Sequence, residues 1–269
     1  MQIPHFLKVL KRILLSNRIG KWYIAKKECN VYSSSAERLK GGYFHAMDVT
    51  PPIGKRVIVI YDNKRRALGF ADRPKSLVSI YKTSKDLNIE FKNLITHPFK
   101  ISRYLTPNKV DWNIKTEELC YNLETTNICC LEMRTGTDYE VRQHEKWFRK
   151  EFKKDYSEFH VRTNAAYSYK YDFSGMFNDL FKPSSLLQKL ISDHVNILGK
   201  EYISTSFRFL DLLGDFNEPD SETICLSQDE KDSLIQANIE QIKRLHEQYA
   251  DMKILVNSDS KTFLEQADN

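Results

Sequence analysis

The sequence predicts an α/β protein. Short apolar runs typical of buried strands alternate along the chain with segments whose apolar residues recur at helical spacing. The 269 residues are 41% hydrophobic and hold nine glycines and eight prolines, so the chain can build two packed cores and is poor in residues that favour disorder. We therefore predict two domains, residues 1–182 and 183–269.

Net charge limits the kinds of ligand that the sequence suggests, and the cysteines and histidines indicate its redox compartment and whether it holds a metal. The 41 basic residues exceed the 36 acidic ones by five, an excess too small to indicate nucleic acid but compatible with a small anionic ligand. Five cysteines form no C-x-x-C pair, as expected of reduced thiols in the cytoplasm. Seven scattered histidines show no metal-ligand spacing, so we expect no metal site.

The first predicted element is a basic amphipathic helix within Ile3–Trp22. Phe6, Leu10, Ile13 and Leu14 fall near one helical face, and lysines and arginines lie between and beyond them. Such a helix can pack on its own domain or lie peripherally on an anionic membrane surface, and both interpretations stay open. The segment lacks the uninterrupted apolar core of a secretory signal, so we expect a cytoplasmic protein, with peripheral contact at the inner membrane as the second possibility.

A βαβ unit follows in the first domain. Residues 55–62, "KRVIVIYD", form a β-branched apolar run typical of a buried parallel strand. Residues 74–87 place leucine, isoleucine and tyrosine at helical spacing behind Pro74, which suits a first helical turn. Residues 88–95 read as the next strand. The aromatic and charged stretch 108–182 predicts only mixed helix and loop.

The second domain repeats the pattern of strand, helix and strand. A helix begins at the serine pair near residue 184 and ends at Gly199. Residues 201–209 read as a strand, and a loop of about seventeen residues leads to a helix whose capping box pairs Ser227 with Glu230. Residues 252–260 form the last predicted strand. Long ordered loops in compact domains are usually functional, so we expect the loop between residues 209 and 227 to contribute to the site.

The stretch "GFADRPKS", from Gly69 to Ser76, approaches a phosphate-binding P-loop without matching it. Such a loop needs a glycine before the lysine so that backbone N–H groups can cradle phosphate, and Pro74 has no N–H. The glycine also lies seven residues beyond Asp62, whereas a P-loop follows its strand directly. We interpret the stretch as a strand-to-helix turn in which Lys75 is exposed.

Three polar clusters follow predicted strands: residues 69–73, Arg208 with residues 214–215, and residues 258–260. Ligands of open parallel sheets bind beyond the carboxyl ends of the strands, so a phosphate-bearing ligand between the two domains would meet all three. No Asp-x-Asp motif is present to hold a divalent ion. Arg208 could instead offer a bidentate fork to a diphosphate, or pair with Asp211 or Asp215 for structure alone.

Four segments, in order, resemble the fucosyltransferase-like GT-B glycosyltransferases, the superfamily of the nodulation α-1,6-fucosyltransferases and the protein O-fucosyltransferases. "YISTSFRFLDLLGDF" is similar to their His-x-Arg and Gly-Asp segment, and "GFADRPKSLVSIYK" to their Gly-Phe-Gly-Asn-Gln turn and helix. "LFKPSSLLQKLI" resembles the helix before the arginine strand, and "KILVNSDSKTFLE" the late Ser-Asp strand end.

The resemblance implies two Rossmann-like domains facing a cleft and metal-independent, inverting transfer of fucose from GDP-fucose, or another nucleotide sugar, to a glycan acceptor in bacterial surface polysaccharide synthesis. Arg208 would stabilise the leaving GDP, and Asp215 or Glu218 could act as general base. The implied donor-binding residues are Ser206, Arg208, Gly214, Ser258, Asp259 and Ser260. The implied sugar and acceptor side comprises Gly69, Phe70, Asp72 and Arg73.

The chain departs from this pattern in three ways. Ser206 stands where the family has a histidine, and Asp72 stands where a neutral amide is common. Only eleven residues follow "ILVNS", so the C-terminal domain is expected to be incomplete and the isolated chain to have weak or absent activity. The alternative function is an inactive, truncated paralogue that binds a nucleotide sugar or a partner protein.

Overall fold

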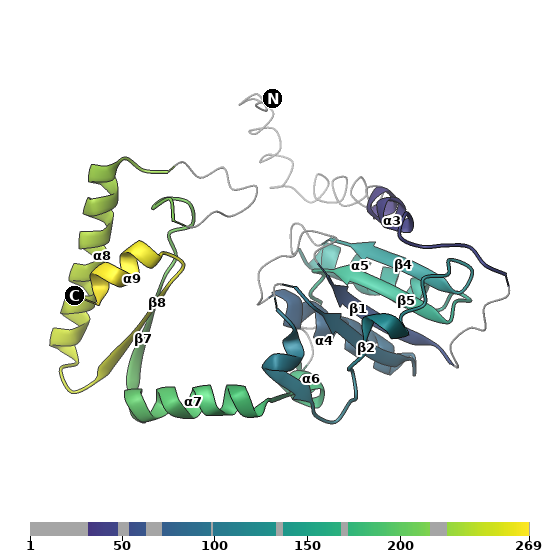
Figure 1. Ribbon diagram of the computed structural model, residues 1–269, viewed down its shortest axis with the longest axis horizontal. Helices are drawn as coiled ribbons and strands as arrows, with labels where there is room; N and C mark the ends of the chain where they lie inside the picture. The colour runs from purple at the N-terminus through teal and green to yellow at the C-terminus, as the bar shows by residue number, and fades with distance from the viewer. Residues whose placement is uncertain are drawn as a thin grey trace. The chain divides into compact units, whose positions relative to one another are not determined.

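The computed structural model describes residues 32–47, 54–62, 72–97, 99–132, 137–167, 172–215 and 225–268. It divides the chain into two compact units, Met1–Leu186 and Leu187–Asn269, whereas we predicted a boundary after residue 182. Both units combine helices with parallel strands, so the α/β prediction is confirmed (Figure 1). The opposition of two such domains across a cleft stays a prediction.

A four-stranded parallel sheet forms the centre of the first unit, in the order β2-β1-β5-β4. Its βαβ unit matches the sequence prediction, because β1 and β2 lie side by side and are joined by α4. The β-branched run of β1 places four successive buried residues at the middle of the sheet. The strands and the joining helix are β1 (Arg56–Tyr61), α4 (Asp72–Asp86), β2 (Glu90–Ile95), β4 (Thr126–Leu131) and β5 (Glu158–Thr163).

Helices α4, α5 (Asp138–Glu151) and α6 (Phe173–Leu180) lie on one face of this sheet (Figure 1). Alternate residues of the strands, such as Val57 and Phe159, point into the main hydrophobic core on that face. Ile58 and Ile60 point to the other face and pack in a smaller cluster with Ile114 and Leu119. Helix α3 (Tyr32–Lys40) contacts β4, and β3 (Leu105–Pro107) pairs antiparallel with β6 (Phe181–Pro183).

The prediction for residues 108–182 was wrong in one respect, because this stretch supplies two of the four strands, β4 and β5. The sequence of β5, "EFHVRT", carries Glu158, His160 and Arg162 at alternate positions, so these three side chains share one face of the sheet. All six residues of β5 are buried. The polar side chains of this buried strand are hydrogen-bonded to one another and to other parts of the chain.

These polar contacts lie on the face of the sheet that carries the smaller hydrophobic cluster. His160 lies 2.5 Å from the Tyr43 hydroxyl through Nδ1 and 2.5 Å from a Glu158 oxygen through Nε2. Arg56 donates to Glu158 at 2.5 Å, and Arg162 lies 2.7 Å from an Asp62 oxygen. Burial and the neighbouring arginines lower the pKa of His160, while hydrogen bonds outweigh burial and lower the pKa of Glu158. A neutral imidazole between an acceptor and a donor satisfies both ring nitrogens.

The second unit contains β7 (Tyr202–Phe207) and β8 (Lys253–Ser258), which pair in parallel, as predicted. Helix α8 (Gln228–Gln248) joins them, and α9 (Lys261–Ala267) follows β8. The expected capping box is present, with the Ser227 N–H donating to Glu230 at 2.9 Å. Helix α7 (Ser185–Leu198) ends where expected, before Gly199 at φ +90°.

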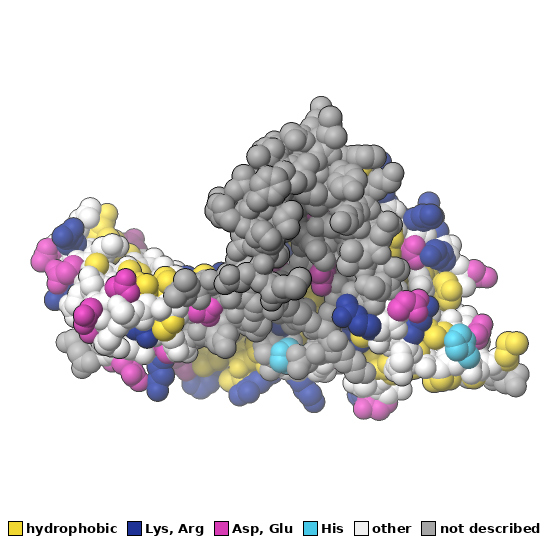
Figure 2. Space-filling view, turned by 90° about the horizontal axis from the view of Figure 1, so that it is seen from above, with side chains coloured by type: hydrophobic (Ala, Val, Ile, Leu, Met, Phe, Trp, Pro, Cys, Tyr) yellow, Lys and Arg dark blue, Asp and Glu magenta, His cyan; other side chains and the backbone are white. Residues whose placement is uncertain are grey.

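The surface carries charges of both signs. On the face shown in Figure 2, basic and acidic side chains are interspersed over the described part of the chain. In the part of the chain that the structure describes, no helix is long and apolar enough to cross a bilayer.

His144 on α5 should make the stability of the protein depend on pH. Its side chain is buried, and burial lowers the pKa of the imidazole to about 4 although Glu140 lies 3.8 Å away. Between pH 6.5 and 4 the unfolded chain binds a proton that the folded chain does not, so stability falls as pH falls, by about 3 kcal/mol at this site.

Urea unfolding at pH 7 and pH 4.5 measures this effect. The His144→Gln variant should lose less stability on acidification than the parent chain, while His246→Gln, at an exposed position on α8, should behave like the parent. Equal losses in all three proteins would contradict the prediction.

Candidate functional site

The carboxyl ends of β7 and β8 form the candidate site. The strands run parallel and in register, with Phe207 opposite Ser258, so the residues that follow them emerge at one edge of the sheet. Arg208 follows β7 with its side chain exposed, and Asp259 and Ser260 follow β8. The structure thus brings together two of the three predicted polar clusters, those of the second domain.

One carboxylate joins the two strand ends. Asp259 accepts hydrogen bonds from the backbone N–H groups of Phe209, at 2.8 Å, and Leu210, at 3.0 Å. Leu210 has a φ of 54°, a conformation that is unfavourable for a branched side chain and is held here by the Asp259 contact. The turn after Arg208 is therefore anchored to β8, and Asp259 is occupied in doing so.

Asp215, a predicted general base, lies against the start of α9. It accepts hydrogen bonds from the Ser260 hydroxyl at 2.9 Å and from the Thr262 N–H at 2.8 Å. Partial burial raises the pKa of this carboxyl, but the bonds from Thr262 and Ser260 outweigh it and hold the pKa below its ordinary value. A carboxylate with a lowered pKa is a weaker base, so the geometry favours an anchoring role for Asp215.

The other predicted donor-side residues surround these two carboxylates. Ser260 caps α9 by accepting from the Phe263 N–H at 3.1 Å, and the Ser258 hydroxyl accepts from the Ser260 N–H at 3.0 Å. Gly214 has a φ of +78°, and a Cβ there would lie 2.9 Å from the sulfur of Cys225. Only glycine fits that position without a shift. Ser206 is exposed on β7, and Glu218 lies outside the described residues.

The first-unit cluster is only partly described, because Gly69, Phe70 and Ala71 lie outside the described residues. The predicted Ile3–Trp22 helix also lies outside them. Asp72 begins α4 and is half-buried, with Lys75 at 3.5 Å from its carboxylate. Lys75 itself is exposed, as the sequence predicts.

Arg73 is buried rather than open to a ligand. Its guanidinium donates to the carbonyl of His97 and lies 5.5 Å from the centre of the Tyr61 ring. Tyr61 in turn donates to the Thr163 carbonyl at 2.5 Å, and burial raises its pKa to about 12. Arg73 therefore ties the carboxyl ends of β1 and β2 to α4, a contact that periodicity along the chain could not reveal.

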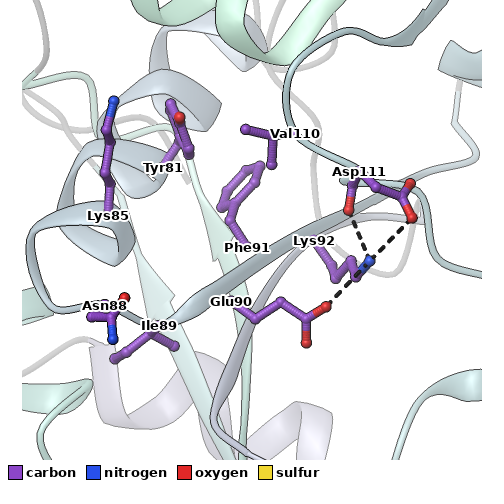
Figure 3. A pocket seen from close by; sticks show the side chains of 9 residues that line it. All are labelled: Tyr81, Lys85, Asn88, Ile89, Glu90, Phe91, Lys92, Val110 and Asp111. Carbon is purple, nitrogen blue, oxygen red and sulfur yellow. Dashed lines mark hydrogen bonds and ion pairs between the residues drawn. The ribbon is translucent and has the colours of Figure 1, made fainter.

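A cavity of about 510 Å³ lies at the opposite, amino end of β2, lined by Tyr81 and Phe91 among others (Figure 3). Lys92 lies 3.3 Å from Glu90 and 3.6 Å from the carboxylate of Asp111, and it donates to the Asp111 carbonyl at 2.8 Å. These two carboxylates neutralise the Lys92 ammonium group, and Lys85, the other basic residue of the lining, lies 3.6 Å from a carboxylate oxygen of Asp179. The cavity is therefore a poor site for a diphosphate compared with the carboxyl ends of the strands.

Within the described ranges, no group of three or more His, Cys, Asp or Glu side chains is placed to hold a metal ion. No family model and no curated protein sequence matches the chain. Among solved structures, the chain is similar to a mutant of Arabidopsis thaliana FUT1 in complex with GDP, with a TM-score of 0.42 and 12% identity over 82% of this chain. The chain spans 63% of that protein's length. With a TM-score below 0.5 and 12% identity, this similarity is used to infer neither the fold nor the activity of the chain.

The clamp at Asp259 yields a stability prediction. Asp259→Ala leaves the N–H groups of Phe209 and Leu210 without their acceptor and should lower the free energy of unfolding of the second unit by about 2–4 kcal/mol. Urea unfolding followed by circular dichroism measures the loss, and hydrogen exchange in β7 locates it. Asp251→Ala, at an exposed acidic residue of the same unit, should change stability by less than about 0.5 kcal/mol. Equal effects of the two substitutions would contradict the clamp.

Proposed function

We propose that the protein binds a nucleotide sugar, GDP-fucose by the sequence resemblance, at the carboxyl ends of β7 and β8 and transfers the sugar to a glycan. The observation that carries the proposal is the parallel pairing of these strands, which sets Arg208 beside the Asp259 and Ser260 strand end. Two segments that resemble one glycosyltransferase superfamily thus meet at one edge of a sheet, although about fifty residues separate them in sequence.

Arg208 would bind the diphosphate of the donor. Arg208 is an exposed residue. A guanidinium presents N–H donors in a fixed fork that fits phosphate oxygens, and each charge-assisted bond contributes about 1.5–3 kcal/mol. During transfer an acceptor oxygen attacks the anomeric carbon, the bond from that carbon to the phosphate oxygen breaks, and its electron pair leaves with GDP. Arg208 would stabilise this developing charge without a metal ion.

The proton of the acceptor hydroxyl must pass to a base. Asp215 is held at the start of α9 with a lowered pKa, and Glu218 stays the other predicted base. We propose further that the acceptor is a glycan of a bacterial surface polysaccharide. The reaction would take place in the cytoplasm, with peripheral membrane contact through the Ile3–Trp22 segment.

A specific observation favours binding without turnover as the alternative. Asp215 is occupied by two hydrogen bonds, and Ser206 lacks the proton-transfer capacity of the histidine that the superfamily has at this position. A chain of this kind could bind a nucleotide sugar and leave it intact. Release of free GDP from GDP-fucose in the presence of glycan acceptors separates the two functions.

Calorimetry with GDP and GDP-fucose tests donor binding. The same measurement with UDP- and dTDP-sugars tests whether the site prefers guanine nucleotides. Arg208→Ala should raise the Kd for GDP about 10- to 150-fold, because it removes roughly 1.5–3 kcal/mol of charge-assisted bonding. Arg208→Lys keeps the charge but loses the fork, so its Kd should lie between those of the parent and the alanine variant.

Arg244→Ala is the matched control, since Arg244 is an exposed arginine on α8 of the same unit. It should bind GDP like the parent chain. Equal weakening by Arg208→Ala and Arg244→Ala, or no binding of any GDP compound by the parent chain, would refute the proposed site.

A further inference from the structure

Helix α7 presents an apolar stripe to solvent. None of its fourteen residues is buried, and Leu190, Ile191 and Val195 are 39%, 50% and 45% exposed. A helix of a soluble protein ordinarily buries such a stripe against another element. The apolar face of α7 is therefore a candidate surface for contact with another apolar surface.

The same unit contains an apolar groove. A cavity of about 1180 Å³ lies along the second half of α8, the amino half of β8 and the end of α9, with Ile242, Met252, Ile254 and Leu264 in its walls and floor. Helix α9 has seven residues and is about 10 Å long, whereas β8 extends about 20 Å, so α9 covers only part of the strand. Lys253, Ile254 and Val256 of β8 line the groove.

We propose that two copies of the chain pair by inserting α7 of each copy into the groove of the other. An exposed apolar helix and an apolar groove are complementary surfaces, the arrangement by which amphipathic helices are commonly recognised. Both surfaces belong to one unit, so a two-fold axis makes the contact twice. The last residues of α7, Ile197 and Leu198, line the groove, which places the two surfaces next to one another as such an axis requires.

Charge favours a second copy over a membrane as the occupant. Lys189 and Asp193 on α7 form an ion pair at 2.5 Å, so the helix offers no excess of positive charge to anionic lipid. The groove is concave and carries both signs at its edge, including Lys243 and Glu247. A flat bilayer cannot enter it, whereas a helix can.

The size of the contact indicates a weak dimer. Helix α7 is about 21 Å long and about 10 Å wide, so one helix–groove contact covers roughly 200 Å² on each side and two contacts cover roughly 800 Å² in all. Stable interfaces bury about 1,200–2,000 Å², and smaller ones belong to transient complexes. We therefore expect a weak dimer that exchanges with monomer and forms only as the protein concentration rises.

Sedimentation velocity of the full chain from 1 to 200 μM tests the proposal. The average mass should rise from the 31.6 kDa monomer toward twice that value. The helix variant Leu190→Asp with Ile191→Asp should stay monomeric, and so should the groove variant Met252→Glu. Ser192→Asp, on an exposed polar position of α7, adds a charge to the same helix and should dimerise like the parent.

Mixing the helix and groove variants adds a second criterion. Each variant keeps the surface that the other lacks, so an equimolar mixture should form a heterodimer through a single contact, with weaker association than the parent chain. A parent chain that stays monomeric at 200 μM overturns the proposal. Dimerisation that Met252→Glu leaves intact also overturns it, because α7 would then pair with α7 or another surface. Binding of the parent chain to anionic vesicles through α7, with no dimer, would assign the helix to lipid instead.

Discussion

The second unit depends on one interaction, the hydrogen bonding of Asp259 to the backbone that follows β7. Parallel strands cannot be joined by a tight turn, and here α8 separates β7 from β8 by dozens of residues. The pairing of their backbones aligns the strand ends, and the carboxylate of Asp259 then holds the loop after Arg208 in a strained conformation at Leu210. Without this bond the predicted phosphate-binding residue would stand on an unsupported turn.

The two carboxylates at the candidate site, those of Asp259 and Asp215, hold the surrounding backbone in place. Asp259 and Asp215 each accept two hydrogen bonds from the loop and helix around them, and for Asp215 these bonds hold the pKa below its ordinary value. The two carboxylates carry the same sign of charge as a diphosphate, so their part in the proposed site is to fix the backbone, and the attraction would come from the exposed Arg208. This arrangement leaves the identity of the proton acceptor as the main chemical question for a transferase.

The first unit solves a different problem, the burial of charge inside a parallel sheet. Glu158, His160 and Arg162 alternate along β5 and would cost several kcal/mol each if they were buried alone. Tyr43, Arg56 and Asp62 supply partners from other parts of the chain. Only with these partners in place can a strand of such composition occupy an interior position next to β1.

The sequence by itself determined the α/β class, the βαβ unit of the first domain and the strand, helix and strand of the second. It did so because these signals are local: β-branched runs, helical spacing, a capping box at Ser227 and a terminating glycine at Gly199. Tertiary structure decided that β5 is buried, that Arg73 ties strands together and that Asp215 sits at a helix start. These outcomes depend on partners distant in sequence, such as Tyr43 for His160 and Thr262 for Asp215, and no local pattern records which partner a polar side chain will meet.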